Sequence, residues 1–229
     1  GDEVQAWPGR PIQPSAAYAL PIISGFEPRG QLLVSATYQD LPNFDPVVAM
    51  MLTQNDEPEP TFSALGWYPS VLWSINRFGD VDRATVLAGQ FNPQTGVERK
   101  YTGMVFETYY TDNTIDFDPP LIWGLTSRLV SAENPNFAAT VEDASKVLVT
   151  CAVPGALVSV ELIRHPTDDA LWTVSADGAT GAPQCAGATE FFVQAMDSAG
   201  NVAVASKEGF HVVGEVLADT IKSIGEERT

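Results

Sequence analysis

The chain has 229 residues, of which 45% are hydrophobic and 18% are charged, so it can bury a core and does not belong to the disordered class. Lys and Arg together number 12 against 29 Asp and Glu, and the net charge of −17 argues against binding to nucleic acid or to anionic lipid. The sequence has no run of about 20 apolar residues, so we expect no insertion into a membrane.

Residues 1–28 are rich in proline, which predicts an extended arm because proline is excluded from helix interiors and central strands. The prolines are Pro8, Pro11, Pro14, Pro21 and Pro28. The arm is either a free terminus or a segment that packs on its own domain or on a neighbouring subunit. Its apolar side chains favour packing, so Trp7 and Tyr18 are candidate contact residues.

Residues 29–111 have the pattern of an antiparallel β domain, with short aromatic-rich strands between residues 61 and 75. The longer expected strands are residues 31–38, 83–91 and 98–110. The last two are joined by a hairpin loop at 92–96, Asn-Pro-Gln-Thr-Gly. The apolar run 46–53 suits a strand buried on both faces, and a short helix is the alternative.

Part of this domain has a second set of recognisable features. They are Trp67-Tyr-Pro-Ser, Asn76-Arg-Phe-Gly-Asp, Phe91-Asn-Pro-Gln-Thr-Gly and Val105-Phe-Glu-Thr-Tyr-Tyr. In this order they resemble the β-rich N-terminal prosegment of gingipain-type cysteine peptidases. The residues that follow lack the pattern of a peptidase catalytic domain. The resemblance therefore implies a fold and an exported setting, and not proteolysis.

Residues 112–120 are the clearest boundary in the chain, because they are acidic and end in two prolines that favour a short stiff linker. Residues 121–214 then have the pattern of an immunoglobulin-like β-sandwich with seven short strands. The expected strands are residues 121–131, 137–141, 147–153, 158–165, 171–176, 191–196 and 202–213. Trp123 and Trp172 are candidate core residues.

The last hairpin of this domain, residues 190–206, turns at Asp197-Ser-Ala-Gly-Asn. Alternating side chains before and after the turn predict two paired strands, and Gly200 can adopt a positive φ there. The hairpin resembles the last hairpin of the immunoglobulin-like domains of secreted bacterial proteins.

Cys151 and Cys185 are the only cysteines, and both lie in the second domain. Two cysteines in an extracellular β domain predict one disulfide, and two buried thiols in a cytosolic protein are the alternative. A zinc site is disfavoured because the sequence has no C-x-x-C pair and only two histidines.

Residues 215–229 change pattern and place apolar side chains at helical spacing, which predicts a short amphipathic helix that stops at Gly225. The helix either folds back on its own domain or docks on a neighbour. In the second case Leu217, Ile221 and Ile224 are the candidate contact residues.

The sequence shows no arrangement typical of catalysis. Neither His165 nor His211 lies near a nucleophile signature, and no glycine-rich phosphate loop is present. We therefore expect no enzymatic activity. Aromatic side chains could bind carbohydrate, although core packing is the more ordinary role for most of them. The candidates are Trp67, Tyr68, Trp73, Tyr109 and Tyr110.

One cluster of oxygen-bearing side chains is expected. In an immunoglobulin-like sandwich the start of the first strand, the loop after the second and the loop before the last lie at one pole. The residues at these positions are Asp116, Asp118, Asp143, Asp197 and Asn201. Hard oxygen ligands from several loops suit Ca²⁺, which is the one candidate cofactor. The alternative is that these side chains cap turns or are solvated.

Together these features predict an all-β protein: an antiparallel β domain followed by an immunoglobulin-like sandwich, outside or on the surface of a prokaryotic cell. The first functional hypothesis is a non-catalytic structural or adhesive protein that self-associates or belongs to a larger surface assembly. The alternatives are a prosegment-like or accessory module of a secreted peptidase, acting as inhibitor or folding aid, and a carbohydrate-binding module.

Overall fold

The computed structural model describes residues 2–5, 10–49, 66–78, 81–131, 134–176, 180–188 and 190–206. Within these ranges the regular structure is antiparallel β, apart from one 3-10 turn at Pro183–Cys185, so the all-β prediction is confirmed. The predicted helix at 215–229 lies outside the described residues. So do the candidate contact residues Trp7, Leu217, Ile221 and Ile224.

The chain forms two compact units whose boundaries differ from the predicted linker at 112–120. The first unit takes the residues up to Pro21 together with Thr37–Gly103. The second takes Ile22–Ala36 and the residues from Met104 onward. The predicted linker therefore lies inside the second unit, and so does an early stretch of the chain that the sequence assigned to the first domain.

The first unit contains a four-stranded sheet in the order β1-β2-β5-β4. Its strands are β1 (Asp2–Gln5), β2 (Gln13–Ala19), β5 (Val81–Leu87) and β4 (Trp73–Phe78). A further hairpin pairs β6 (Gly89–Asn92) with the start of β7 (Val97–Thr111). Asn92 closes its turn by accepting the backbone N–H groups of Gln94 and Thr95, which confirms the predicted hairpin loop.

The expectation that proline keeps residues 1–28 out of central strands is wrong for the described residues, because β2 is an inner strand between β1 and β5. Of the alternatives left open for this segment, packing on its own domain is the one observed for β2. Pro14 has no backbone N–H, and its position in the strand explains why this is tolerated. In an antiparallel strand the N and O of one residue point to the same side. The Pro14 carbonyl accepts from Ala88, just beyond the last residue of β5, so the missing N–H would point to a place where β5 has already ended. Tyr18 lies on this strand with its side chain exposed.

Three other local predictions differ from the structure. The expected strand at 83–91 is broken at Ala88, whose N–H donates to Pro14 and whose carbonyl accepts from Tyr101. The residues Asn76-Arg-Phe-Gly-Asp have the composition of a turn, but β4 continues to Phe78. Of the expected strand at 46–53, residues 46–49 are described, and they form only an isolated bridge between Val48 and Pro11.

The second unit contains the seven strands expected from the sequence. They are β8 (Leu121–Ser131), β9 (Asn134–Glu142), β10 (Lys146–Val153), β11 (Ala156–His165), β12 (Asp168–Thr173), β13 (Glu190–Met196) and β14 (Val202–Ser206). Their order is β14-β13-β10-β11-β12-β9-β8.

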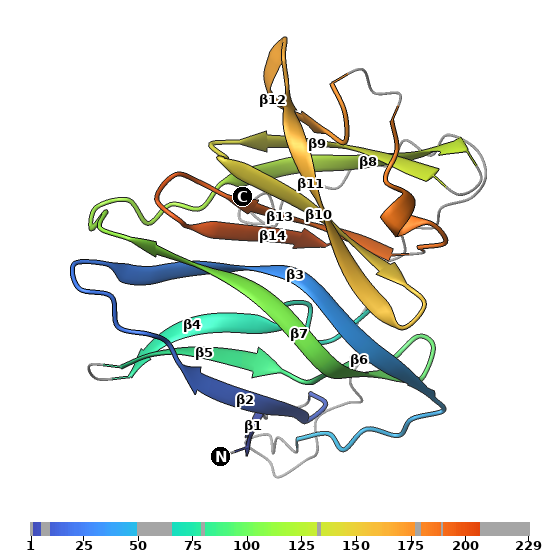
Figure 1. Ribbon diagram of the computed structural model, residues 1–229. Coiled ribbons are helices and arrows are strands. Elements are labelled where there is room, and N and C mark those ends of the chain that lie inside the picture. The colour runs from blue at the N-terminus through green and yellow to red at the C-terminus, as the bar shows by residue number, and fades with distance from the viewer. Residues whose placement is uncertain are drawn as a thin grey trace, which may run out of the picture. The chain divides into compact units, whose positions relative to one another are not determined.

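Strand β11 links two halves of this order. Its first part, residues 156–162, pairs with β10, and its end, residues 163–165, pairs with β12, with a register shift between Arg164 and His165 inside this end (Figure 1). The third, sixth and seventh strands of the unit thus lie on one side of β11, and the fifth, second and first on the other. Strands that are not consecutive in sequence are neighbours in this order, such as β9 and β12, which gives it a Greek-key form.

The main core of the second unit lies on one face of the sheet formed by β10 and β13. Alternate residues such as Val147, Val149 and Val193 are fully buried there, and the rings of Phe137 and Phe191 pack with centroids 4.9 Å apart. Trp172 belongs to this core and donates its indole N–H to the carbonyl of Val141. Trp123 does not, since 36% of it is exposed, so its prediction as a core residue is wrong.

The opposite face of the same sheet is covered by β3 (Glu27–Pro42), which also pairs with β7 and β11. Leu32 of β3 packs there against Leu148 and Met196, and all three are buried. Burial on both faces of the sheet explains why residues 22–36 belong to the second unit.

Candidate functional site

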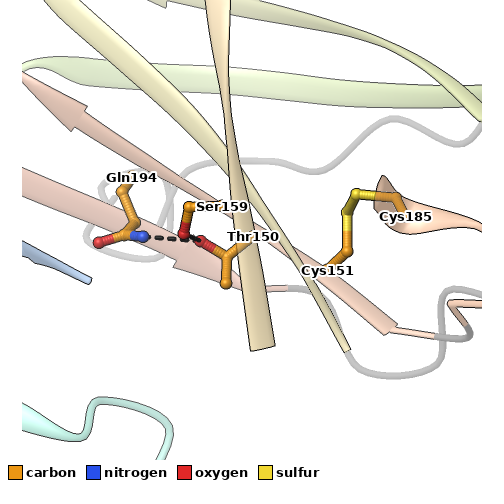
Figure 2. Close-up of a disulfide and its surroundings, with 5 residues drawn as sticks. All are labelled: Thr150, Cys151, Ser159, Cys185 and Gln194. Atoms are coloured by element: carbon orange, nitrogen blue, oxygen red, sulfur yellow. Dashed lines mark hydrogen bonds between the residues drawn. A yellow bond between two sulfur atoms is a disulfide. The ribbon is translucent and has the colours of Figure 1, made fainter. Parts of the chain in front are cut away.

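The two cysteines are joined by a disulfide, with their Cα atoms 5.6 Å apart (Figure 2). Cys151 lies in the middle of the sheet on β10, and Cys185 ends the 3-10 turn Pro183–Cys185. Both are fully buried. The bond therefore fixes the long connection between β12 and β13 onto the core, and neither sulfur is available for chemistry.

A buried amide holds β3 on the sandwich. Gln194 of β13 accepts the backbone N–H of Leu33 at 2.7 Å and donates to the Leu33 carbonyl at 2.9 Å. Its side chain thus offers one acceptor and one donor to one residue, as a neighbouring strand would. The same amide nitrogen donates to Thr150 Oγ1, which also bonds Ser159 (Figure 2), and Ser159 donates to the Leu33 carbonyl. All donors and acceptors in this hydrogen-bond network are groups of the protein itself.

Four of the five candidate calcium ligands meet at one pole of the second unit. Asn201 is the centre of this group. Its backbone N–H donates to Asp197 Oδ1 and its side-chain amide to Asp197 Oδ2. The same amide donates to the carbonyls of Asp116 and Asp118 at 3.4 and 3.3 Å. The hydrogen bonds of Asn201 therefore bring the backbone of Asp116 and Asp118 close to the side chain of Asp197.

Asp143 is exposed and makes no hydrogen bond or ion pair with the other four candidates within the described residues. Its turn nevertheless reaches the same pole. Ser145 donates its hydroxyl to the carbonyl of Asp197 at 2.7 Å. The position of Asp143 at a positive φ of 55° fits a turn residue.

The pole contains a positively charged side chain, Arg29 of β3. Its guanidinium donates to the carbonyls of Asn113 and Asp116 at 2.5 Å each, and to Asn201 Oδ1 at 3.4 Å. It also lies over the ring of Phe117, with 4.1 Å between Cζ and the ring centroid. Two oxygens of the candidate ligands, the Asp116 carbonyl and Asn201 Oδ1, are thus bonded to an arginine, as a planar guanidinium with several donors allows.

Within the described ranges no three His, Cys, Asp or Glu side chains form a group that could hold a metal ion. Calcium binding at these residues stays a prediction.

Two loops of the second unit, one bonded to Arg29 and one just before the strand that carries Arg29, have exposed apolar side chains. Ile115 and Phe117 are 90% and 63% exposed on the loop bonded to Arg29. Ile22 is 89% exposed, and Ile23 and Phe26 are about half exposed, on the turn just before β3. We call these five residues the apolar rim.

The loop that carries Ile115 is held by its own hydrogen bonds. Asn113 Oδ1 accepts the backbone N–H groups of Ile115 and Asp116, both at 3.0 Å. Together with the contacts of Arg29 and Asn201, these bonds fix the backbone from which two large apolar side chains project into water.

The aromatic candidates for carbohydrate binding have protein partners. In the first unit, the Arg99 guanidinium lies between the rings of Tyr38 and Trp67, 3.9 and 4.1 Å from their centroids. It also forms a two-point ion pair with Asp40. Tyr68 faces Arg10, and Trp73 is buried.

In the second unit, Tyr109 donates its hydroxyl to Glu107 and accepts from Lys146, and Tyr110 is half-buried. Lys146 also donates to Glu107 at 2.7 Å. Burial raises the pKa of Tyr109, and so does its hydrogen bond to Glu107. These side chains form a local ion-pair cluster.

Of the two histidines, His165 is described and His211 is not. The His165 ring bonds only the backbone N–H and hydroxyl of Thr167, two residues later on the exposed turn between β11 and β12. This is a local turn contact. No other side chain of the described structure bonds this ring, so it lacks the orienting group of a catalytic triad.

Sequence reasoning missed Arg29 and Gln194, and of the two only Gln194 carries a signal. Gln194 is a polar residue in the otherwise apolar strand Phe191–Met196, where a fully buried polar side chain needs a partner. Arg29 follows a proline-rich stretch and shows no pattern with the acidic residues more than 80 positions later. Its role depends on tertiary contacts.

No model of a known protein family, no curated protein and no solved structure matches this chain. The described structure also contains no helix that is long and apolar enough to span a membrane.

Proposed function

We propose that the protein is a non-catalytic structural or adhesive component of the prokaryotic cell surface, and a subunit of an extracellular assembly. The observation that supports this proposal is the apolar rim. Five large apolar side chains are exposed on two loops, one bonded to Arg29 and one just before β3, and the loop bonded to Arg29 is held by a dense set of hydrogen bonds. Apolar groups gathered on an ordered surface are typical of protein interfaces.

Two physical arguments favour an interface. Burying Ile115 and Phe117 on association would remove apolar surface from water, at about 25 cal/mol per Å². The loop is already ordered, so less conformational entropy is lost on binding than for a mobile loop.

The disulfide supports an extracellular setting, because such bonds persist where the environment is oxidising.

The test is the mass of the purified full chain in solution, compared with the double variant Ile115→Ser and Phe117→Ser. Val105→Ser is the matched control, because Val105 is also exposed in the second unit but lies on β7 outside the rim. We expect the full chain and the control to form a species larger than a monomer by sedimentation velocity, and the double variant to remain a monomer. A monomeric full chain, or a double variant that associates like the control, would reject self-association through the rim.

Removal of residues 1–28 is not a clean test of association, because it deletes β2 from the middle of its sheet. Removal of residues 207–229 leaves all described strands intact. This truncation therefore tests whether the predicted terminal helix contributes to association.

Carbohydrate binding has less support. The candidate aromatic side chains contact protein groups, and no observation specifically favours a sugar.

A further inference from the structure

A buried carboxyl and a buried amide face each other in the first unit. Glu98 of β7 and Gln13 of β2 are 7% and 2% exposed. Gln13 Nε2 donates to Glu98 Oε2 at 3.3 Å. The amide oxygen, Gln13 Oε1, is fully buried and has no hydrogen-bond donor among the described residues. A buried acceptor without a donor is costly, so this atom needs explanation.

The position of the second carboxyl oxygen, Glu98 Oε1, explains how Gln13 Oε1 can find a donor. Gly89 of β6 has no side chain, and a Cβ there would lie 2.3 Å from Gln13 Oε1 and 2.4 Å from Glu98 Oε1. The two oxygens therefore converge on one point above Gly89. Both are acceptors when Glu98 is ionised, and they would then repel each other with no hydrogen between them.

Among the described side chains of the packed elements, no positive charge is placed to neutralise Glu98. On β7, Arg99 points to the opposite face and pairs with Asp40, while Lys100 shares the face of Glu98 by alternation but is exposed. β6 carries no ionisable side chain. β2 has only Tyr18, near its far end, where the neighbouring β5 brings Asp82 and Arg83. Arg10, just before β2, is exposed and lies over the Tyr68 ring.

We propose that Glu98 is held as a neutral carboxylic acid whose proton is donated from Oε1 to Gln13 Oε1, forming a two-hydrogen-bond clasp between β7 and β2 that opens when Glu98 ionises. In the closed clasp the amide donates to one carboxyl oxygen and accepts from the other, so all four polar positions are used. On opening, the O–H bond breaks and the proton goes to solvent. The carboxylate then faces the amide oxygen, and β2 loses its tie to β7.

The burial of Glu98 agrees with this assignment. It raises the pKa of the carboxyl, while the hydrogen bond from Gln13 acts in the opposite direction. Because the folded-state pKa lies above the unfolded value, folding takes up a proton in the interval between the two. Stability therefore falls as the pH rises through that interval. The clasp is an acid-stabilised fastening of the N-terminal strands.

The first test is the protonation state of Glu98 in the full chain. The side-chain carboxyl ¹³C signal of Glu98 is followed by NMR from acid to alkaline pH and assigned by its absence from the variant Glu98→Gln. We expect it to titrate above the ordinary value of 4.5. Titration at or below that value would overturn the proposal, since a water molecule or a cation would then be the missing partner.

The second test is the fastening of β2. Hydrogen exchange at the amides of Gln13–Ala19 is compared at about pH 5 and about pH 8 after correction for intrinsic chemistry. We expect protection in the natural chain to fall by about tenfold per pKa unit of the shift at the higher pH. In Glu98→Gln it should not change, because a second amide keeps both hydrogen bonds at every pH.

Asp45→Asn is the matched control, because Asp45 is an exposed acid of the same unit. It should keep the pH dependence of the natural chain. An equal loss of protection in Glu98→Gln and in the natural chain would also overturn the proposal.

Discussion

At the scale of single residues, the second unit depends on polar side chains that replace backbone pairing. Gln194 gives Leu33 both a donor and an acceptor, and Arg29 gives two loop carbonyls their donors. Such groups stabilise little in net terms while they are paired. They cost far more when one partner is removed, because the remaining groups are buried without water.

We predict that Gln194→Met destabilises the protein by roughly 1–3 kcal/mol, the cost of one buried group left without a partner. Methionine preserves volume but leaves the Leu33 N–H without its acceptor, while the Thr150 hydroxyl and the Leu33 carbonyl keep their hydrogen bonds with Ser159. The measurement is the free energy of unfolding from urea denaturation. Gln184→Met, at an exposed site in the same unit, should change it by less than about 0.5 kcal/mol. A similar small effect of Gln194→Met would show that the amide is not needed to hold β3.

At the scale of elements, the disulfide decides how the connection between β12 and β13 is placed. This connection contains the 3-10 turn Pro183–Cys185, which has no side-chain N-cap. A short turn of this kind has little stability of its own. Cys185 fixes it to Cys151 in the centre of the sheet, where Ala182 and Ala188 join the core.

We predict that the double variant Cys151→Ala and Cys185→Ala loses about 3–4 kcal/mol of unfolding free energy. The reason in the loop-entropy account is that the bond closes a separation of 34 residues in the unfolded chain. The measurement is urea denaturation of the variant beside the oxidised natural chain. Reduction of the natural chain should give a comparable loss, and a loss of less than about 1 kcal/mol in both would contradict the prediction.

At the scale of the whole molecule, charge opposes association. Each chain carries a net charge of −17, so two copies repel each other at long range. Salt shortens the range of this repulsion, since the Debye length falls from about 30 Å at 0.01 M to about 8 Å at 0.15 M. An apolar contact is not weakened by the same change.

We therefore predict that self-association through the apolar rim strengthens as sodium chloride is raised from about 0.01 to about 0.15 M. The measurement is the dissociation constant from sedimentation at each salt concentration. Association that weakens with salt would indicate contacts made by opposite charges, and would contradict an apolar interface.

The amino-acid sequence by itself determined which segments become strands in the second unit. Leu121–Ser131 was expected with these bounds, and Phe191–Met196 within one residue of the observed strand. The reason is that alternation of apolar and polar residues and the glycine turns act over a few neighbouring positions. The pairing of Cys151 with Cys185 followed from there being only two cysteines.

Only the tertiary structure decided which distant residues meet. Sequence reasoning predicted that Asp116, Asp197 and Asn201 lie at one pole, but it did not predict Arg29 among them. It also assigned residues 29–36 to the first domain, whereas the structure places residues 22–36 in the second unit. The clasp of Gln13 with Glu98 joins positions 85 apart. Such contacts depend on how buried faces are stacked and on which polar groups must find partners there, and local periodicity contains no information about either.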